Sequence, residues 1–270
     1  MNVPATAPSG ALPRRAWVEQ IMGLPISIHL RGPELGSPRV EAQVQAVFSE
    51  LRHADDVFST YRADSDLSRW ENGELCTEDA DRTLIQVFAL CAEAGRRTDG
   101  WFDPRGLPDP TSWRPRYDPS GLVKGWAVER ASRQLRALAD HDWCLNAGGD
   151  IAVSTLAANP AWRVGIEDPT NPQRVAVVVP LRAGAIATSS TAHRGAHIID
   201  PFSGRPAAAL RAVTVVGPSL LWADVYATAA SAQGMGALEW LERLPGYEAI
   251  FVGPPGLTRT TSGWLFPPED

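Results

Sequence analysis

The segment DPSGLVKGWAVERA, residues 118–131, combines two glycines with the only lysine of the chain. Lys124 lies between Gly121 and Gly125, where a helical pattern begins. Glycines let a backbone approach a ligand closely, and the free N–H groups at the start of a helix favour anions. The segment predicts a phosphate site with Lys124 as its cation. A strand-to-helix turn with a solvated lysine is the alternative interpretation of these residues alone.

A second candidate, ADVYATAAS, lies in a helical pattern nearer the C-terminus. Asp224 and Thr228 are four residues apart, so their oxygens project from one face of a helix. Hard oxygen ligands of this kind suit Mg²⁺ that is shared with the phosphates of a substrate. The alternative is structural: an aspartate that complements the helix dipole and a threonine bonded to a preceding carbonyl.

A third candidate is the stretch IATSSTAHRGAHIIDPFSGRPA. It places His197 after a hydroxyl cluster at residues 188–191 and before Asp200 and Pro201. Histidine titrates nearest neutral pH, so His197 could act as a general base. A structural histidine on a short strand is the alternative, and His193 is a weaker candidate for the same role.

Three smaller features complete the set. Met22 and Gly23 predict a turn between strands. Tyr61, at the end of a helical pattern, could stack on a planar ring or pack in the core. Gly148, Gly149 and Asp150 predict a hairpin turn, which needs no ligand to explain it.

The composition limits the class of protein. The chain has 270 residues, a formal net charge of -6 and 44% hydrophobic residues, which fits a folded domain and argues against a binder of duplex nucleic acid. Its three cysteines are far apart, which predicts reduced thiols and no zinc site. No secretory leader and no membrane span is visible, so we expect a disordered leader at residues 1–16 and a cytoplasmic protein without membrane insertion.

The elements that must position these residues follow from hydrophobic periodicity. After residue 142 the sequence consists of short runs of β-branched residues joined by Gly, Pro and Asn turns, and this pattern predicts strands. Helices and strands do not alternate regularly, so we expect an α+β fold with largely antiparallel sheet. Neither GxGxxG nor GxxxxGK[ST] occurs. The patterns predict a strand at 25–30, helices at 40–59, 80–97, 124–138 and 222–244, and a last strand at 248–252.

Nine blocks, in order along residues 17–252, resemble the ApbE family, the FAD:protein FMN transferases. They are IMGLPISI, FSTYRADSDLSRW, GWFDP, SGLVKGWAVERA, LNAGGDI, WRVGIEDP, AIATSS, HIIDPFSGRPA and AVTVVGPSLLWADVYATAAS. The resemblance implies an ApbE-like α+β fold of mixed, largely antiparallel sheets and packed helices, in a single large domain at residues 17–270. It also implies an enzyme that attaches FMN from FAD to a Thr or Ser of a target flavoprotein, with Mg²⁺ at the pyrophosphate and release of AMP.

The resemblance also implies a role for individual residues. Met22 and Tyr61 would line the isoalloxazine, and His197 would lie near the scissile phosphate as the catalytic base. The metal would be held by Asp224, Thr228 and the backbone carbonyl of Val123. The other cofactor-binding residues would be Trp101, Phe102, Asp103, Ser120, Lys124, Thr188 and Ile198.

Three departures from the family pattern stand out. Glu71 occupies a position where members usually carry an asparagine, Arg105 follows the GWFDP block where a threonine is common, and the stretch before HIID is short. Two other functions stay open from the sequence. Water could replace the protein hydroxyl, which would give an FAD pyrophosphatase, or the chain could bind flavin without turnover.

Overall fold

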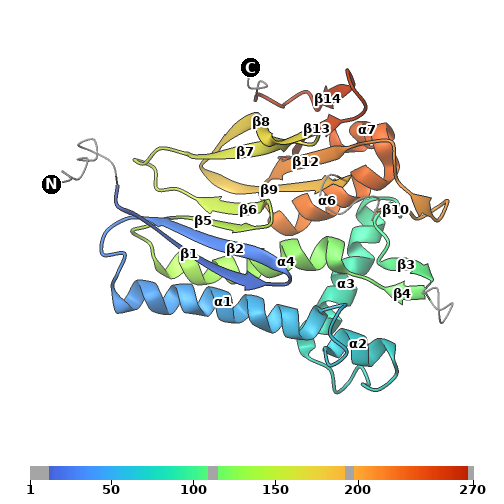
Figure 1. The fold of residues 1–270 in the computed structure, drawn as a ribbon, viewed down its shortest axis with the longest axis horizontal. Helices are drawn as coiled ribbons and strands as arrows, with labels where there is room; N and C mark the ends of the chain where they lie inside the picture. The colour runs from blue at the N-terminus through green and yellow to red at the C-terminus, as the bar shows by residue number, and fades with distance from the viewer. Residues whose placement is uncertain (1–11, 109–114, 192–197, 267–270) are drawn as a thin grey trace.

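A sheet of eight antiparallel strands forms the centre of the protein (Figure 1). The structure is a computed structural model, and it describes residues 12–108, 115–191 and 198–266. The strand order is β1-β2-β5-β6-β9-β12-β13-β14. The strands span β1 Arg14–Ile21, β2 Leu24–Arg31, β5 Asp142–Ala147, β6 Asp150–Ser154, β9 Ala183–Ser190, β12 Ala212–Gly217, β13 Glu248–Val252 and β14 Thr258–Thr260.

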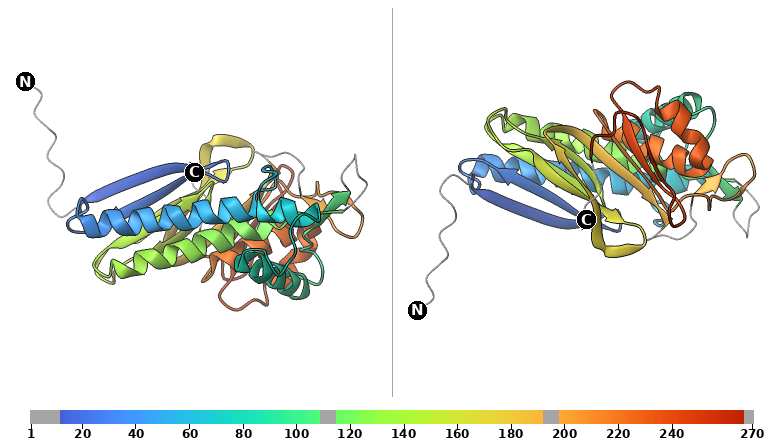
Figure 2. Two further views of the ribbon diagram at one scale, coloured as in Figure 1. Left: turned by 90° about the horizontal axis from the view of Figure 1, so that it is seen from below. Right: turned by 90° about the horizontal axis from the view of Figure 1, so that it is seen from above.

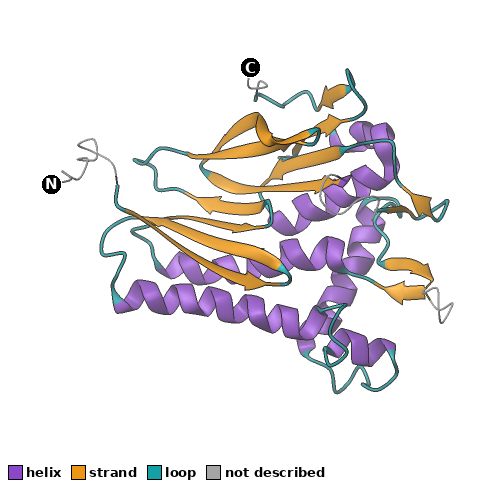
Figure 3. Cartoon of the chain, in the orientation of Figure 1, coloured by secondary structure: helices purple, strands orange, loops and turns teal. Residues whose placement is uncertain are grey.

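Helices cover one face of this sheet, and Figures 2 and 3 show them gathered on that side. The long helices α1 and α4 pack against each other there, and α4 also packs against α6. Their apolar residues fill the larger core with the inward residues of the sheet. The helices span α1 Pro38–Phe58, α2 Asp66–Glu71, α3 Arg82–Arg97, α4 Ser120–Ser132, α6 Leu220–Gln233 and α7 Ala237–Leu241, with 3₁₀ helices at Arg133–Ala137 and Gly234–Gly236.

A two-stranded ribbon, β7 Trp162–Asp168 and β8 Asn171–Leu181, covers the other face. Side chains alternate across a strand, so each central strand supplies both cores. In β5, Leu145 and Ala147 pack in the core under the helices, while Cys144 packs in the core under the ribbon. The central strands are therefore buried on both sides, and the chemistry must lie at an end of the sheet.

Two short ribbons extend from one end of the molecule, at the right of Figure 1. They are β3 Arg105–Pro108 with β4 Pro115–Tyr117, and β10 Ile199–Asp200 with β11 Arg205–Pro206. Glu71, one of the departures from the family pattern, accepts a hydrogen bond from the backbone of Tyr117 and so connects α2 to β4.

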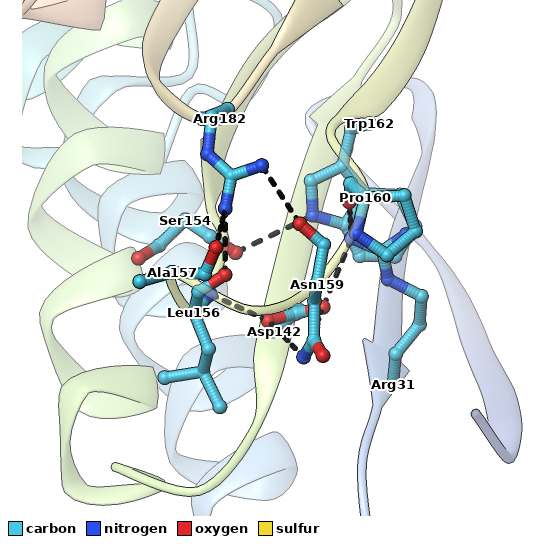
Figure 4. Close-up of polar contacts among 9 residues, drawn as sticks. All are labelled: Arg31, Asp142, Ser154, Leu156, Ala157, Asn159, Pro160, Trp162 and Arg182. Atoms are coloured by element: carbon cyan, nitrogen blue, oxygen red, sulfur yellow. Dashed lines mark hydrogen bonds and ion pairs between the residues drawn. The ribbon is translucent and has the colours of Figure 1, made fainter.

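A buried ion pair stabilises the opposite end of the sheet (Figure 4). Arg31 Nη2 lies 2.9 Å from Asp142 Oδ2, and its guanidinium carbon lies 3.9 Å from the centre of the Trp162 ring. Asp142 also accepts hydrogen bonds from the backbone of Leu156, at 2.7 Å, and from Asn159. One carboxylate thus fixes the connection between β6 and β7.

The antiparallel α+β fold predicted from the sequence is confirmed, with three corrections. The predicted turn at Met22 and Gly23 is confirmed, and β1, the strand before it, begins at Arg14, so residues 14–16 of the expected leader belong to a strand. The helix at 124–138 begins earlier, at Ser120. The single helix expected at 222–244 is broken at Gly234, whose φ of 79° ends α6.

None of the helices in the described part of the chain combines the length and apolar character needed to cross a membrane.

Candidate active site

A cleft of about 610 Å³ collects most of the residues that the sequence singled out. Its walls come from the β1–β2 and β5–β6 turns, the segment before β3, helices α4 and α6, and strand β9. The predicted residues that line it are Trp101, Phe102, Asp103, Ser120, Lys124, Thr188, Ile198, Asp224 and Thr228.

Helices α4 and α6 meet closely at the cleft, because α4 has no side chains at Gly121 and Gly125 and the side chains of α6 lie against its backbone there. A Cβ on Gly125 would lie 2.8 Å from both Asp224 Cβ and Leu220 O, and a Cβ on Gly121 would lie 3.1 Å from Thr228 Cγ2. The two glycines were predicted to let a ligand approach the backbone. At Gly125 the group that approaches is helix α6 instead, and this contact brings Asp224 and Thr228 to the cleft.

Glu129 fastens the same two helices one turn farther along α4. Its carboxylate accepts hydrogen bonds from the Ser219 hydroxyl at 2.6 Å and from the backbone N–H of Leu221 at 3.1 Å. Ser219 is the N-cap of α6, so a carboxylate from α4 satisfies the first turn of α6. This contact fixes the rotation of α6 relative to α4.

Asp224 is a buried carboxyl group with an unusual environment. Only 3% of the residue is exposed, and Oδ2 accepts a 3.0 Å hydrogen bond from the backbone N–H of Gly125. Burial, followed by the negative charge of Asp150, raises the pKa of Asp224 to about 8. Lys124 and the Gly125 N–H act in the opposite direction but do not outweigh burial. Without a bound cation, burial therefore favours the protonated form of Asp224.

Lys124 lies in the second turn of α4, beside Asp224. Its Nζ is 2.8 Å from Asp150 Oδ2, and the Lys124 side chain is 21% exposed. Asp150 Oδ1 in turn accepts a 3.3 Å hydrogen bond from the backbone N–H of Thr188. The lysine predicted as a phosphate cation thus lines the cleft with its ammonium held by a buried carboxylate.

Hydroxyl groups line the cleft wall next to Asp224. Thr228 Oγ1 lies 3.3 Å from Ser189 Oγ, and Thr188 Oγ1 lies 2.8 Å from Thr214 Oγ1. Among the described residues, no three His, Cys, Asp or Glu side chains form a group that could hold a metal ion. Asp224 and Thr228 therefore fit Mg²⁺ only as a pair of hard oxygen donors that shares the ion with phosphates and water, which is how Mg²⁺ is usually bound.

An aromatic wall, formed by Trp101 and Phe102, also lines the cleft. Phe102 is buried, and Trp101 packs edge-to-face against Phe202 with ring centroids 4.6 Å apart. Phe202 remains 66% exposed at the tip of the β10–β11 ribbon. Asp103 accepts hydrogen bonds from Arg105 Nε and Nη2; burial raises the pKa of Asp103, but the contacts with Arg105 outweigh it and the pKa is lowered. This aspartate therefore stays ionised.

Three predicted residues are not among the described residues that line the cleft. Met22 forms the β1–β2 turn with a φ of 55°, and its backbone N–H donates to Asp55 Oδ2. Tyr61 is 99% exposed beyond α1, so core packing is wrong for it. Val123 has its side chain in the core. His197 and His193 lie outside the described residues.

From the sequence we did not assign Gly148, Gly149, Asp150 or Glu167 to the site. Gly148 and Gly149 form the predicted turn but also line the cleft, and Glu167 lines it from the irregular end of β7. Asp150, set aside as part of a turn, pairs with Lys124. The sequence did contain a signal for these residues, because they lie in the LNAGGDI and WRVGIEDP blocks that resemble the family.

Comparisons with known proteins identify the family and the relatives of this chain. The sequence model of the ApbE family matches residues 22–118 and 109–251. A curated relative from Vibrio cholerae serotype O1, named FAD:protein FMN transferase, is 27% identical over 276 residues, covering 77% of this chain and 81% of that protein. A relative of the same name from Escherichia coli K12 is 22% identical over 294 residues, covering 87% and 83%.

Solved structures share the fold. The flavin transferase ApbE from Vibrio cholerae superposes with a TM-score of 0.78 at 20% identity, covering 93% of this chain and 98% of that chain. The ApbE protein from Thermotoga maritima gives a TM-score of 0.77 at 20% identity, covering 93% and 97%.

Proposed function

This chain belongs to the ApbE family, and we propose that it is an FAD:protein FMN transferase that moves FMN from FAD to a threonine or serine of an acceptor flavoprotein. The curated relatives that carry this name support the activity. AMP is the leaving group, and Mg²⁺ assists the reaction.

One observation carries the proposal: a single cleft combines an aromatic wall with a cation and hard oxygen donors. Trp101 offers partly exposed aromatic surface at the cleft beside the buried Phe102, while Lys124, Asp224 and Thr228 come from helices α4 and α6. A dinucleotide that contains flavin has the matching chemistry, because its ring is planar and its diphosphate is anionic. The volume of about 610 Å³ is in the ordinary range for a cofactor site.

The reaction is a displacement at phosphorus. The acceptor hydroxyl oxygen forms a bond to the phosphorus of the FMN half, the bond from that phosphorus to the bridging oxygen breaks, and AMP leaves with this oxygen. The hydroxyl proton passes to a base. Lys124 contributes a positive charge beside the diphosphate, which stabilises the negative charge that develops on the phosphates.

Asp224 and Thr228 would hold Mg²⁺, and this ion would supply further charge neutralisation at the diphosphate when bound. We assign the base to His197 on the family resemblance of its sequence block. We likewise carry over Met22, Tyr61 and the Val123 carbonyl as cofactor or metal contacts on that resemblance alone.

The test is to incubate the protein with FAD, MgCl₂ and a candidate acceptor, and to measure AMP release together with the intact mass of the acceptor. We expect AMP and FMN-modified acceptor in equal amounts, and no modification of an acceptor in which the target Thr is replaced by Val. AMP without a modified acceptor would indicate an FAD pyrophosphatase. FAD binding without AMP would indicate a flavin-binding protein.

A further inference from the structure

Asp150 is a buried carboxylate that lies beneath residues lining the cleft. It is the first residue of β6, directly after the Gly148–Gly149 turn, and it is fully buried. The cleft is lined by Lys124, Thr188 and Asp224, all of which contact Asp150, but Asp150 itself is not among the described residues that line it. A buried charge is costly unless it is paired, so these contacts account for its presence.

The contacts of Asp150 join three separate elements. Oδ2 pairs with the Lys124 ammonium of α4 at 2.8 Å, and Oδ1 accepts from the Thr188 backbone of β9 at 3.3 Å. The negative charge of Asp150 also acts on the carboxyl group of Asp224 on α6, whose pKa it helps to raise. Asp150 therefore pairs with the cation and acts electrostatically on the carboxyl group that the proposed reaction uses.

Lys124 interacts with the acidic residues Asp150 and Asp224, and these two residues have different proposed roles. It pairs directly with Asp150, and it also interacts electrostatically with Asp224. A lysine side chain is a flexible four-carbon stem with a point charge at its end. Without the Asp150 carboxylate, Asp224, the proposed metal ligand, remains as an acidic group that attracts this ammonium. Pairing with Asp224 would draw the ammonium away from the diphosphate and occupy that ligand.

We propose that Asp150 is a positioning residue of the transfer site, which holds the Lys124 ammonium toward the phosphate region of the cleft and away from Asp224. The proposal rests on the proposed function for its ligand, FAD. It assigns to Asp150 an effect on FAD binding that is exerted through Lys124. A residue needed only for stability would lower the melting temperature without this dependence on Lys124.

The test is a double-mutant cycle on FAD affinity, measured by flavin fluorescence in EDTA so that neither a metal nor turnover contributes. The variants are Asp150→Asn, which keeps the size and the acceptor for the Thr188 N–H, then Lys124→Gln and the double variant. We expect each single variant to raise the Kd for FAD about 10-fold, which corresponds to about 1.4 kcal/mol, close to the contribution of one hydrogen bond to a charged group. The double variant should bind FAD no more weakly than Lys124→Gln alone, because the two residues act as one unit.

Asp142→Asn is the matched control. Asp142 is also fully buried, begins the neighbouring strand β5 and pairs with Arg31 at 2.9 Å, but at the other end of the hairpin (Figure 4). It should lower the melting temperature and leave the Kd for FAD unchanged. If Asp150→Asn alone does not fold, the double variant removes both charges of the pair and leaves neither charge buried alone. Comparing its Kd for FAD with that of Lys124→Gln then tests whether Asp150 acts through Lys124.

Additive losses in the cycle, or an unchanged Kd in folded Asp150→Asn, would overturn the positioning role. These outcomes differ from a failure of the proposed function, in which the wild-type protein would not bind FAD or would bind it without transfer. As a further readout, Asp150→Glu restores the charge, so we expect it to recover part of the FAD affinity that Asp150→Asn loses.

Discussion

The backbone N–H of Gly125 donates a 3.0 Å hydrogen bond to Asp224 Oδ2, so a carboxyl group of α6 rests on the backbone of α4. Only a glycine permits this contact, because any Cβ at position 125 would enter the space of Asp224 and Leu220. The position of the proposed metal ligand is therefore a property of the helix pair, and changes in the packing of the two helices should alter both stability and activity.

Gly125→Ala should be destabilising. The added Cβ would lie 2.8 Å from Asp224 Cβ and from Leu220 O, so α4 and α6 must move apart. Overpacking of this kind costs about 1–3 kcal/mol, and we expect urea unfolding to show a loss in that range together with weaker FMN transfer. Gly36→Ala is the control, because its Cβ would meet only Arg15 Nη1 at 3.9 Å. Equal stability of the two variants would contradict the tight contact.

Asp224→Asn should change how stability depends on pH. The unfolded chain releases the Asp224 proton near pH ~4, whereas the folded, metal-free protein retains it up to about pH 8. Between these limits the folded state binds more protons than the unfolded state, so the contribution of Asp224 to the free energy of unfolding falls as pH rises. It is fully present below the lower limit and lost above the upper one.

The measurement is urea unfolding in EDTA across this pH range for wild type and variant. We expect the free energy of wild type minus that of Asp224→Asn to decrease with rising pH and to level off near the upper limit. A difference that stays constant with pH would show that Asp224 is ionised throughout.

Asp224→Asn should also weaken the dependence of FMN transfer on magnesium. Loss of a group behind a metal ligand already costs ~10–100-fold in metal affinity, so loss of a ligand charge should raise the half-saturating Mg²⁺ concentration at least ~10-fold. Asp140→Asn is the control. Asp140 is exposed and pairs with Arg39, so this variant should leave the half-saturating Mg²⁺ concentration unchanged. The same half-saturating concentration in both variants would remove Asp224 from the metal site.

Asp142→Ala should be among the most destabilising single changes. It would leave the Arg31 guanidinium buried without its carboxylate, and breaking a buried pair in this way costs about 3–5 kcal/mol. The exposed pair of Arg243 and Glu239 is the control, since Arg243→Ala should have little effect on thermal unfolding. A small effect of Asp142→Ala would mean that Trp162 and the Pro160 carbonyl suffice to hold Arg31.

His197→Ala should slow FMN transfer by ~10²–10⁴-fold and leave the affinity for FAD nearly unchanged, because a general base acts on the hydroxyl and not on the cofactor. Single-turnover transfer at saturating FAD and Mg²⁺ separates the two effects. A parallel loss of rate and FAD affinity would indicate positioning instead, and an unchanged rate would assign the activation of the hydroxyl elsewhere.

Local sequence patterns predicted much of the fold and of the site. Apolar residues at helical spacing predicted α1, because its buried side chains form one continuous face. The bounds of β1 were not predicted beyond the turn at Met22 and Gly23, because it is an edge strand with only Ile21 buried and shows little apolar alternation. The break at Gly234 was also missed, because apolar residues continue on both sides of it.

Contacts between distant segments could not be predicted in this way. The pairing of Asp224 and Thr228 follows from helical spacing alone, but the partners of Asp150 lie on α4, β9 and α6. Only the assembled sheet and helices bring these together. The two glycines of α4 were recognised as permitting a close approach, whereas the identity of the approaching group depends on the packing of α6.

The residues that line the cleft range from Leu24, near the start of the chain, to Ala232, near its end. Joining such remote segments is the slow part of folding, because the entropy of closing long loops is lost before the contacts form. The cleft should therefore be one of the last features to form during folding, and a fragment that ends before α6 would lack Asp224 and Thr228 from its lining. Recovery of FAD binding during refolding would consequently mark the completion of the whole chain, later than the recovery of helical circular dichroism.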